Sequence, residues 1–495
     1  MFEKAAVSQL KLEDSELQDE VTRLLNQLGK QGSSWSSWTF QKVIMRLGSY
    51  SLIEYDHQNR TYSIHPLVHH WSGTTIEGNR YGLHKLILTI IMLSFSLTDT
   101  DEDIKYRRKL LKHTTSSITS LRQDDIDPLV GMHIAKIYDE AGRFKETEAL
   151  EAMVVEKRKQ VLGDDHPDTL DSIESLAGTY WSQGRWSDAE ALCLVVLEKR
   201  KLILGDDHPD TLKIMEHLAY TYLDQGRWSD AEALCLVVVE KKVMVLGNDH
   251  PDTLKSMGAL AAAYYTQGRL ADAETLELVL MEKRKRLLGE DHPETIGTMG
   301  NIATNYTNQG RLNDAEALGF VAMEKSKQVL GEDHPDTLIT MGNLANTYRE
   351  QGRLNDAEAL ETVVLEKRKK LLGDEHPLTL RVMSQLAVTY WKLGRWSDAE
   401  ALQVVTMEKM KRVLGDDHRF TLKNIENLAE TYRAQSRLDD AVALQEAVME
   451  KRRQVLRAGH PDTLKSMLNL AATYRDLGRM NDADALEAVV EKTKQ

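Results

Sequence analysis

The sequence predicts an all-α solenoid of about nine helical hairpins, which follows a smaller domain of mixed α and β structure. Three observations carry this prediction. A box that begins as Asp165-His166-Pro167-Asp168 recurs with its histidine every 42 residues, a glycine recurs at the same period between the boxes, and two apolar-periodic segments fill each unit. The histidines are His166, His208, His250, His292, His334, His376, His418 and His460, and the glycines are Gly184, Gly226, Gly268, Gly310, Gly352, Gly394 and Gly478.

The second unit shows why each repeat should be a helical hairpin. Pro167 suits the first position of a helix, and Gly184 suits a left-handed residue that ends it. Ser187 followed by Glu190 predicts a capping box, so a second helix should start there and end at Gly205. Neither helix can bury its apolar stripe alone, so successive hairpins should stack and contact mainly their neighbours.

The repeats resemble a known family. Leu176, Ala177, Tyr180, Gly184 and Ala189 follow the pattern of the tetratricopeptide repeat, with small residues where helices cross and an aromatic wedge between them. The period and the Leu-Gly-x-Asp-His-Pro-x-Thr linker are similar to the kinesin-light-chain subtype. The resemblance covers residues 129–495 and implies a right-handed superhelix whose first helices line a concave groove.

The chain before the repeats predicts two domains. Residues 17–28 and 38–47 predict amphipathic helices, and residues 51–55 and 60–64 alternate as a β-hairpin around a polar loop. A helix from residue 65 would complete a winged-helix-like domain over 1–75, and 76–128 would form a helical bridge. This arrangement resembles the C-terminal part of fungal NB-ARC/STAND-type proteins with such repeats. No GxxxxGK[ST] phosphate loop occurs in the sequence, so the resemblance implies no nucleotide site here.

Charge and composition disfavour several classes of partner. The net charge of −14 falls on the repeats, because acidic and basic residues balance over residues 1–126, so nucleic-acid binding is disfavoured. The most apolar segment, Leu83–Leu97, is too short to span a membrane, and the start lacks a secretory signal. Cys193 and Cys235 occupy the same position in neighbouring repeats, too far apart for a disulfide, so we expect a reducing, cytoplasmic location.

No catalytic or metal constellation emerges from the sequence. The repeated histidines each lie about one repeat apart, too far to share one ion, and are better interpreted as parts of the linkers. His65, His69 and His70 lie closer together, but Pro66 stands where an HExxH motif requires glutamate. The acidic residues recur with the repeat and cap helices or solvate a face. We therefore expect no enzyme activity, no cofactor and no metal.

The candidate binding residues lie on the first helix of each hairpin. Asn301, Asn343, Asn427 and Asn469 stand two positions before a recurring alanine, where the family resemblance implies contact with the backbone of a bound peptide. Four positions after that alanine the side chains vary, and the later repeats offer Arg349, Trp391, Arg433 and Arg475. The arginines could bind carboxylates of an acidic partner, or they could pair with local acids such as Glu350, Glu430 and Asp476.

The predicted function is a non-enzymatic scaffold that binds an extended peptide or a partner protein in the groove. One alternative is a regulatory, ligand-sensing arm of a STAND NTPase whose nucleotide-binding core is absent from this chain. Another is a cargo adaptor similar to kinesin light chain, which would need a heptad coiled coil that residues 1–128 do not contain. The identity of the partner and the oligomeric state are left open.

Overall fold

A computed structural model describes residues 53–56, 61–64, six helical positions between 107 and 118, and residues 126–456 and 459–494. The chain divides into two compact units, residues 1–134 and 135–495, which are described separately. In the first unit, strands β1 (Ile53–Asp56) and β2 (Thr61–Ile64) pair antiparallel, with Ile53 opposite Ile64. This is the hairpin that the sequence predicts. The remaining elements of the predicted winged helix lie outside the described residues.

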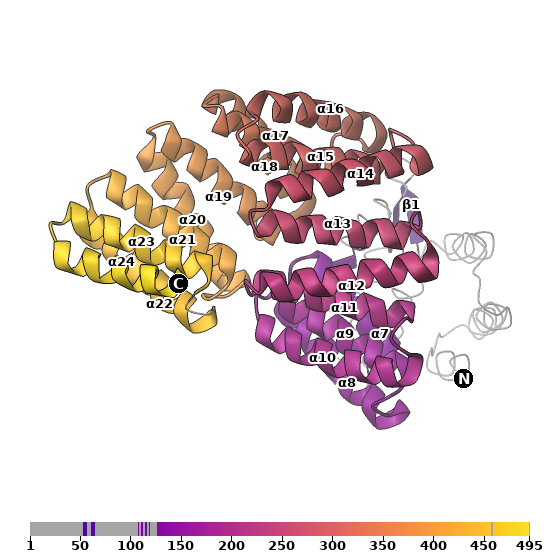
Figure 1. Cartoon of the computed structure of the whole chain (residues 1–495). Coiled ribbons are helices and arrows are strands. Elements are labelled where there is room, and N and C mark those ends of the chain that lie inside the picture. The colour runs from indigo at the N-terminus through magenta and orange to yellow at the C-terminus, as the bar shows by residue number, and fades with distance from the viewer. Residues whose placement is uncertain are drawn as a thin grey trace. The chain divides into compact units, whose positions relative to one another are not determined.

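Nine consecutive pairs of helices occupy the described part of the chain from residue 128 onward (Figure 1). Their bounds are α7 Pro128–Glu140, α8 Phe144–Leu162, α9 Pro167–Ser182, α10 Trp186–Leu204, α11 Pro209–Asp224, α12 Trp228–Leu246, α13 Pro251–Thr266, α14 Leu270–Leu288, α15 Pro293–Asn308, α16 Leu312–Leu330, α17 Pro335–Glu350, α18 Leu354–Leu372, α19 Pro377–Lys392, α20 Trp396–Val413, α21 Arg419–Ala434, α22 Leu438–Val455, α23 Pro461–Asp476 and α24 Met480–Lys494. We call the first helix of each pair the A helix and the second the B helix. From α8 onward each helix packs against the next.

The recurring histidines build the starts of the A helices. His166 is the N-cap of α9, and its Nδ1 accepts a hydrogen bond from the backbone N–H of Asp168 at 3.1 Å. Pro167 then occupies the first turn, where its missing N–H costs nothing. The same cap recurs at all eight linkers, including His418, where arginine replaces proline. The linker interpretation of these histidines is therefore confirmed.

The turn from A helix to B helix corrects one prediction. Gly184 has φ +75°, the left-handed conformation expected of it. The predicted capping box is wrong, however, because α10 begins at Trp186 and leaves Ser187 inside its first turn. The N-cap is Arg185, which makes no side-chain cap bond. Its guanidinium instead stacks on Tyr180 at 4.0 Å and pairs with Asp188 at 2.7 Å.

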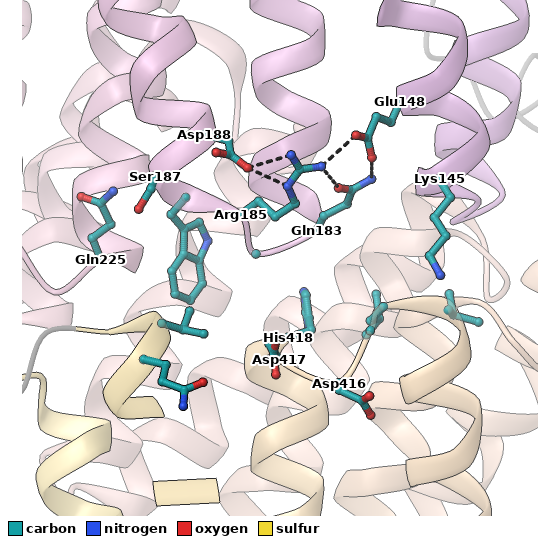
Figure 2. Close-up of a pocket in the computed structure, with 17 residues that line it drawn as sticks. Lys145, Glu148, Gln183, Arg185, Ser187, Asp188, Gln225, Asp416, Asp417 and His418 are labelled. Carbon is teal, nitrogen blue, oxygen red and sulfur yellow. Dashed lines mark hydrogen bonds and ion pairs between the residues drawn. The ribbon is translucent and has the colours of Figure 1, made fainter. Parts of the chain in front are cut away.

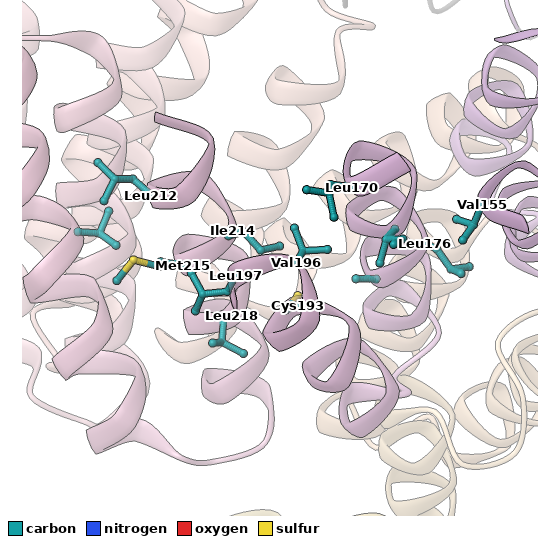
Figure 3. Close-up of a cluster of buried hydrophobic side chains, with 13 residues drawn as sticks. Val155, Leu170, Leu176, Cys193, Val196, Leu197, Leu212, Ile214, Met215 and Leu218 are labelled. Atoms are coloured by element: carbon teal, nitrogen blue, oxygen red, sulfur yellow. The ribbon is translucent and has the colours of Figure 1, made fainter. Parts of the chain in front are cut away.

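The core is a continuous apolar seam between successive helices. In Figure 3, Leu170 and Leu176 of α9, Cys193 and Val196 of α10, and residues of α11 such as Leu218 share one cluster. Both cysteines are free and buried, as predicted, and burial raises the pKa of each thiol to about 12. They act as small core residues.

The second unit curves toward its A helices. Consecutive A helices such as α15 and α17, or α11 and α13, approach one another directly, in addition to contacting the B helix between them. The curvature brings distant hairpins into contact. His376 Nε2 lies 3.1 Å from the carbonyl oxygen of Glu140, and Arg419 pairs with Asp224.

Candidate binding site on the A-helix face

The surface that carries the candidate residues is the A-helix face, the side of the A helices that the B helices leave uncovered. On α9 it presents Asp171, Gly178 and Trp181, all exposed, while Leu170 and Leu176 point into the core. The same positions recur every 42 residues on α11 to α23. The helical period therefore determines which residues a ligand lying across the repeats would meet.

Four asparagines lie on this face as predicted from their spacing. Asn301 is exposed, and Asn343, Asn427 and Asn469 are half-buried. The amide of Asn469 donates to Glu426 at 3.0 Å. Within the described part of the chain, the side chains of the other three make no hydrogen bond. Their donors and acceptors are thus available to a ligand.

Gln385 is a residue that the sequence analysis missed. It lies midway between Asn343 and Asn427 at the same repeat position, is half-buried, and has no side-chain hydrogen bond among the described residues. The side-chain amides therefore form an uninterrupted row over five A helices, from α15 to α23, which we call the amide ladder: Asn301, Asn343, Gln385, Asn427 and Asn469. Allowing glutamine as well as asparagine at the position would have identified it, because both amides carry the same donor and acceptor.

The three candidate arginines are already paired with carboxylates. Arg349 is buried and lies 2.6 Å from Glu361, Arg433 lies 2.5 Å from Asp476, and Arg475 lies 2.6 Å from Glu487. A ligand carboxylate would compete with these contacts. Trp391 is different: it is half-buried, and its indole Nε1 is a buried donor with no partner in the described part.

A second kind of site on this face is a buried carboxylate surrounded by basic side chains. Glu174 of α9 lies 2.7 Å from Arg200 of α10, 3.1 Å from Lys213 and 3.0 Å from His217, both on α11. Burial alone would raise the pKa of Glu174, but His217, Lys213 and Arg200 together lower that pKa to about 2. The charge of Glu174 is therefore neutralised inside the solenoid.

A small hollow opens at the corresponding place on α17. Gly342 and Asn343 of α17, Glu361 and Arg368 of α18, and Arg381 and Gln385 of α19 line a cavity of ≈ 20 Å³. A water molecule needs roughly 10–15 Å³ by the same measure, so the cavity has room for a small polar group. Glu361 is committed to Arg349, so the hollow has two other cations and no free carboxylate of its own.

A larger hollow of ≈ 500 Å³ lies between hairpins that the curvature brings together (Figure 2). Within its lining, Arg185 pairs with Glu148 at 2.8 Å and with Asp188 at 2.7 Å. His418 closes one side, and burial together with the charge of Arg419 lowers its pKa to about 4, so it is neutral near pH 7. These contacts join the hairpins, while Lys145, which also lines the hollow, has no ion pair within the described part of the chain.

The described residues contain no group of three or more His, Cys, Asp and Glu side chains placed to hold a metal ion. None of their helices is both long enough and apolar enough to cross a membrane.

Most of the chain matches models of one protein family, the tetratricopeptide repeat. One family model matches residues 132–168, 169–210, 211–252, 253–294, 295–336, 337–378 and 379–419, and a second family model with the same description matches residues 419–489. A comparison with curated proteins gives no match.

The solved structures that are similar to the chain include the following three. A putative kinesin light chain with nearly identical TPR-like repeats from Podosopora anserina is 27% identical, over 41% of this chain and 96% of that one, with a TM-score of 0.36. BtubC (BKLC) from P. vanneervenii is 20% identical, over 46% and 91%, with a TM-score of 0.39. A Rap protein complexed with competence and sporulation factor is 12% identical, over 75% and 98%, with a TM-score of 0.47.

Proposed function

Because the chain belongs to the tetratricopeptide repeat family, we propose that it is a non-catalytic scaffold whose A-helix face binds an extended peptide or an extended segment of a partner protein. The observation that carries the proposal is the amide ladder of Asn301, Asn343, Gln385, Asn427 and Asn469. Four of these five side chains have no hydrogen-bond partner in the described part of the protein. Polar groups that the fold leaves unused on a recurring position are available for recognition.

The chemistry of the ladder suits a peptide backbone. Each amide side chain offers both a donor and an acceptor, and an extended peptide presents N–H and C=O groups along its length. Packed helices lie about 8–10 Å apart, so successive amides can meet successive segments of one extended chain. Trp391, whose indole N–H has no partner among the residues that the structure describes, adds an apolar surface and one more donor.

The test replaces two amides and compares peptide binding. In the double variant Asn343→Ala, Asn427→Ala, peptides selected from a random library on the wild-type protein should bind about tenfold or more weakly, since each lost hydrogen bond is worth about 1 kcal/mol. Isothermal titration calorimetry with the selected peptides measures the loss. The matched control is Asn313→Ala, Asn355→Ala, which removes two exposed asparagines from B helices α16 and α18. Equal affinity of both double variants and the wild type would contradict the proposal.

A second candidate function is a regulatory arm of a STAND NTPase. The observation that favours it is the antiparallel pair β1 and β2, which is the described part of the predicted winged helix. In this role the repeats would sense a ligand for a nucleotide-binding core supplied by another chain or another segment. A reading frame upstream that encodes a P-loop would support this role, and a promoter directly before Met1 would count against it.

A further inference from the structure

Three glutamates on the A-helix face hold cations in a recurring arrangement. Glu174 contacts Arg200 of its own B helix, and Lys213 and His217 of the next A helix. The arrangement recurs in part elsewhere. Glu216 pairs with Lys242 at 2.9 Å, and Glu426 pairs with Arg452 at 3.1 Å and accepts from Asn469 at 3.0 Å.

Four repeats after Glu174, the same arrangement lacks its glutamate. Gly342 stands at the position of Glu174, while Arg368, Arg381 and Gln385 stand at the positions of Arg200, Lys213 and His217. All four line the hollow on α17. The cations and the polar neighbour are retained, and only the carboxylate that they surround in the earlier hairpin is missing.

Arg368 has lost every acid that its counterparts use. Arg200 pairs with Asp171 at 2.6 Å as well as with Glu174, but Ile339 and Gly342 occupy those positions beside Arg368. In another hairpin Arg284 pairs with Glu294 at 3.1 Å, and the residue corresponding to Glu294 is Leu378.

Within the described residues Arg368 retains one hydrogen bond, donated to the carbonyl oxygen of Leu378 at 2.9 Å, although the residue is only 5% exposed. Arg381 has no hydrogen bond or ion pair within the described part of the chain. Burial and the charge of Arg381 lower the pKa of Arg368 to about 10, so it still carries its charge near pH 7. A buried cation without an anion is costly, which favours an anionic ligand beside it.

The hollow has space for the missing group. A Cβ built on Gly342 would meet no atom within 4 Å, and Gly342 lies in the interior of α17. The other helix glycines at this position do not reproduce the site. Arg284, beside Gly258, is engaged by Glu294, and Gly300 has Ser326 and Ile339 where cations would stand.

We propose that the hollow at Gly342 is a carboxylate-binding subsite in which Arg368 and Arg381 hold an acidic side chain of the bound peptide. The inference rests on the proposed function, because the peptide lies along the amide ladder that passes through Asn343 and Gln385. A carboxylate is the anion of choice because glutamate fills the equivalent space in three other hairpins. Two guanidinium groups match the two oxygens of such a ligand.

The first test supplies the carboxylate from the chain itself. Gly342→Glu should melt at a temperature higher by about 2 °C or more than Gly342→Gln, because both substitutions improve helix propensity alike and only glutamate brings the charge. An equal or lower melting temperature for Gly342→Glu would overturn the proposal. This comparison needs no peptide, so its failure is distinct from a failure of the proposed function, which the asparagine variants test.

The second test adds the carboxylate as a ligand. N-acetyl-glutamate should bind the wild-type protein at least about tenfold more tightly than N-acetyl-glutamine, measured by NMR titration of the full chain. The preference should disappear in Gly342→Glu, whose own carboxylate occupies the hollow, and in Arg368→Met. Methionine already stands at that repeat position as Met410, so this variant keeps a side chain that the fold accepts. Equal binding of acid and amide, or a preference that persists in Gly342→Glu, would refute the subsite.

Discussion

Two junctions of this solenoid carry a cation at the same two repeat positions, and only one of the junctions has a glutamate between them. Between α9, α10 and α11, Glu174 contacts Arg200, Lys213 and His217, whereas between α17, α18 and α19, Gly342 supplies Arg368 and Arg381 with no carboxylate at that position. The first arrangement is closed and serves the stability of the solenoid. The second is open and serves recognition in our proposal. The difference shows how a binding site can arise in a repeat protein when one repeat carries glycine in place of the glutamate that pairs with the cations in other repeats.

The repeats provide their own reference for such comparisons. A buried arginine is difficult to interpret in a single-copy fold, because no equivalent residue shows what its normal partner would be. Here the equivalent residues Arg200, Lys242 and Arg452 each pair with a glutamate at one repeat position, which identifies the normal partner. The departure at Arg368 is therefore measured against the same backbone in the same chain.

The largest effect on stability is expected when the glutamate is removed from the junction between α9, α10 and α11. Glu174→Ala should lower the free energy of unfolding by about 3–5 kcal/mol, because it leaves Arg200 buried without its buried partner. Urea denaturation followed by circular dichroism measures the change. The control is Asp171→Asn, which removes the more exposed partner of Arg200 and should cost about 1 kcal/mol or less. If the two variants lose the same stability, the buried pair does not stabilise the junction as argued.

A smaller effect on stability should distinguish a buried carboxylate that contacts cations, such as Glu174, from one that does not, such as Glu151. The two should differ in how their contribution to stability depends on pH. Glu151 of α8 is buried and accepts from Thr179 at 2.6 Å; burial raises its pKa to about 7, against the lowering by Thr179, and Asp139 raises it further. A folded pKa above the unfolded value of 4.5 means that the contribution of Glu151 to stability is present below pH 4.5 and is lost as pH rises through 7. Glu174 has the opposite sign: its contribution is present above pH 4.5 and is lost as pH falls toward 2.

Accordingly, the free energy of unfolding of Glu151→Gln, relative to that of the wild type, should increase by about 2 kcal/mol as the pH rises from 5 to 8. Denaturation of both proteins at the two pH values measures the difference. Glutamine is a fitting replacement because Gln403 occupies the equivalent position and accepts from Thr431 at 2.8 Å. A difference that does not change with pH would show that Glu151 is not the titrating group.

The smallest effects on stability are expected from replacing two glycines that differ in backbone conformation. Gly342→Ala should raise the free energy of unfolding by about 0.5–1 kcal/mol, since a helix interior with open space favours alanine. Gly184→Ala should lower it by more than that, because Gly184 has φ +75° and its Cβ would lie 3.2 Å from His418 Cδ2. Thermal melts of the two variants measure both changes. Stabilisation by both substitutions would contradict the assigned backbone conformations.

Much of the local structure could be predicted from the sequence because its causes are local. The histidine of each linker, and the proline that follows all of them except His418, act within one helical turn, and the left-handed glycine acts at its own position. The placement of the asparagines on one face follows from the 3.6-residue period alone. The start of the B helices could not be predicted in the same way. Arg185 is held by Tyr180 and by Glu148 of the preceding hairpin, and this contact takes the place of the expected serine cap.

The sequence by itself determined the period, the hairpin unit, its glycine and histidine ends, and the position of the amide ladder, because each depends on neighbours within a few residues. Only the tertiary structure decided which charges meet. Arg349 pairs with Glu361 and not with the adjacent Glu350, and Arg368 faces the space of Gly342. These relations join residues of different helices, so they exist only once the hairpins are stacked and their side chains share a low-dielectric seam.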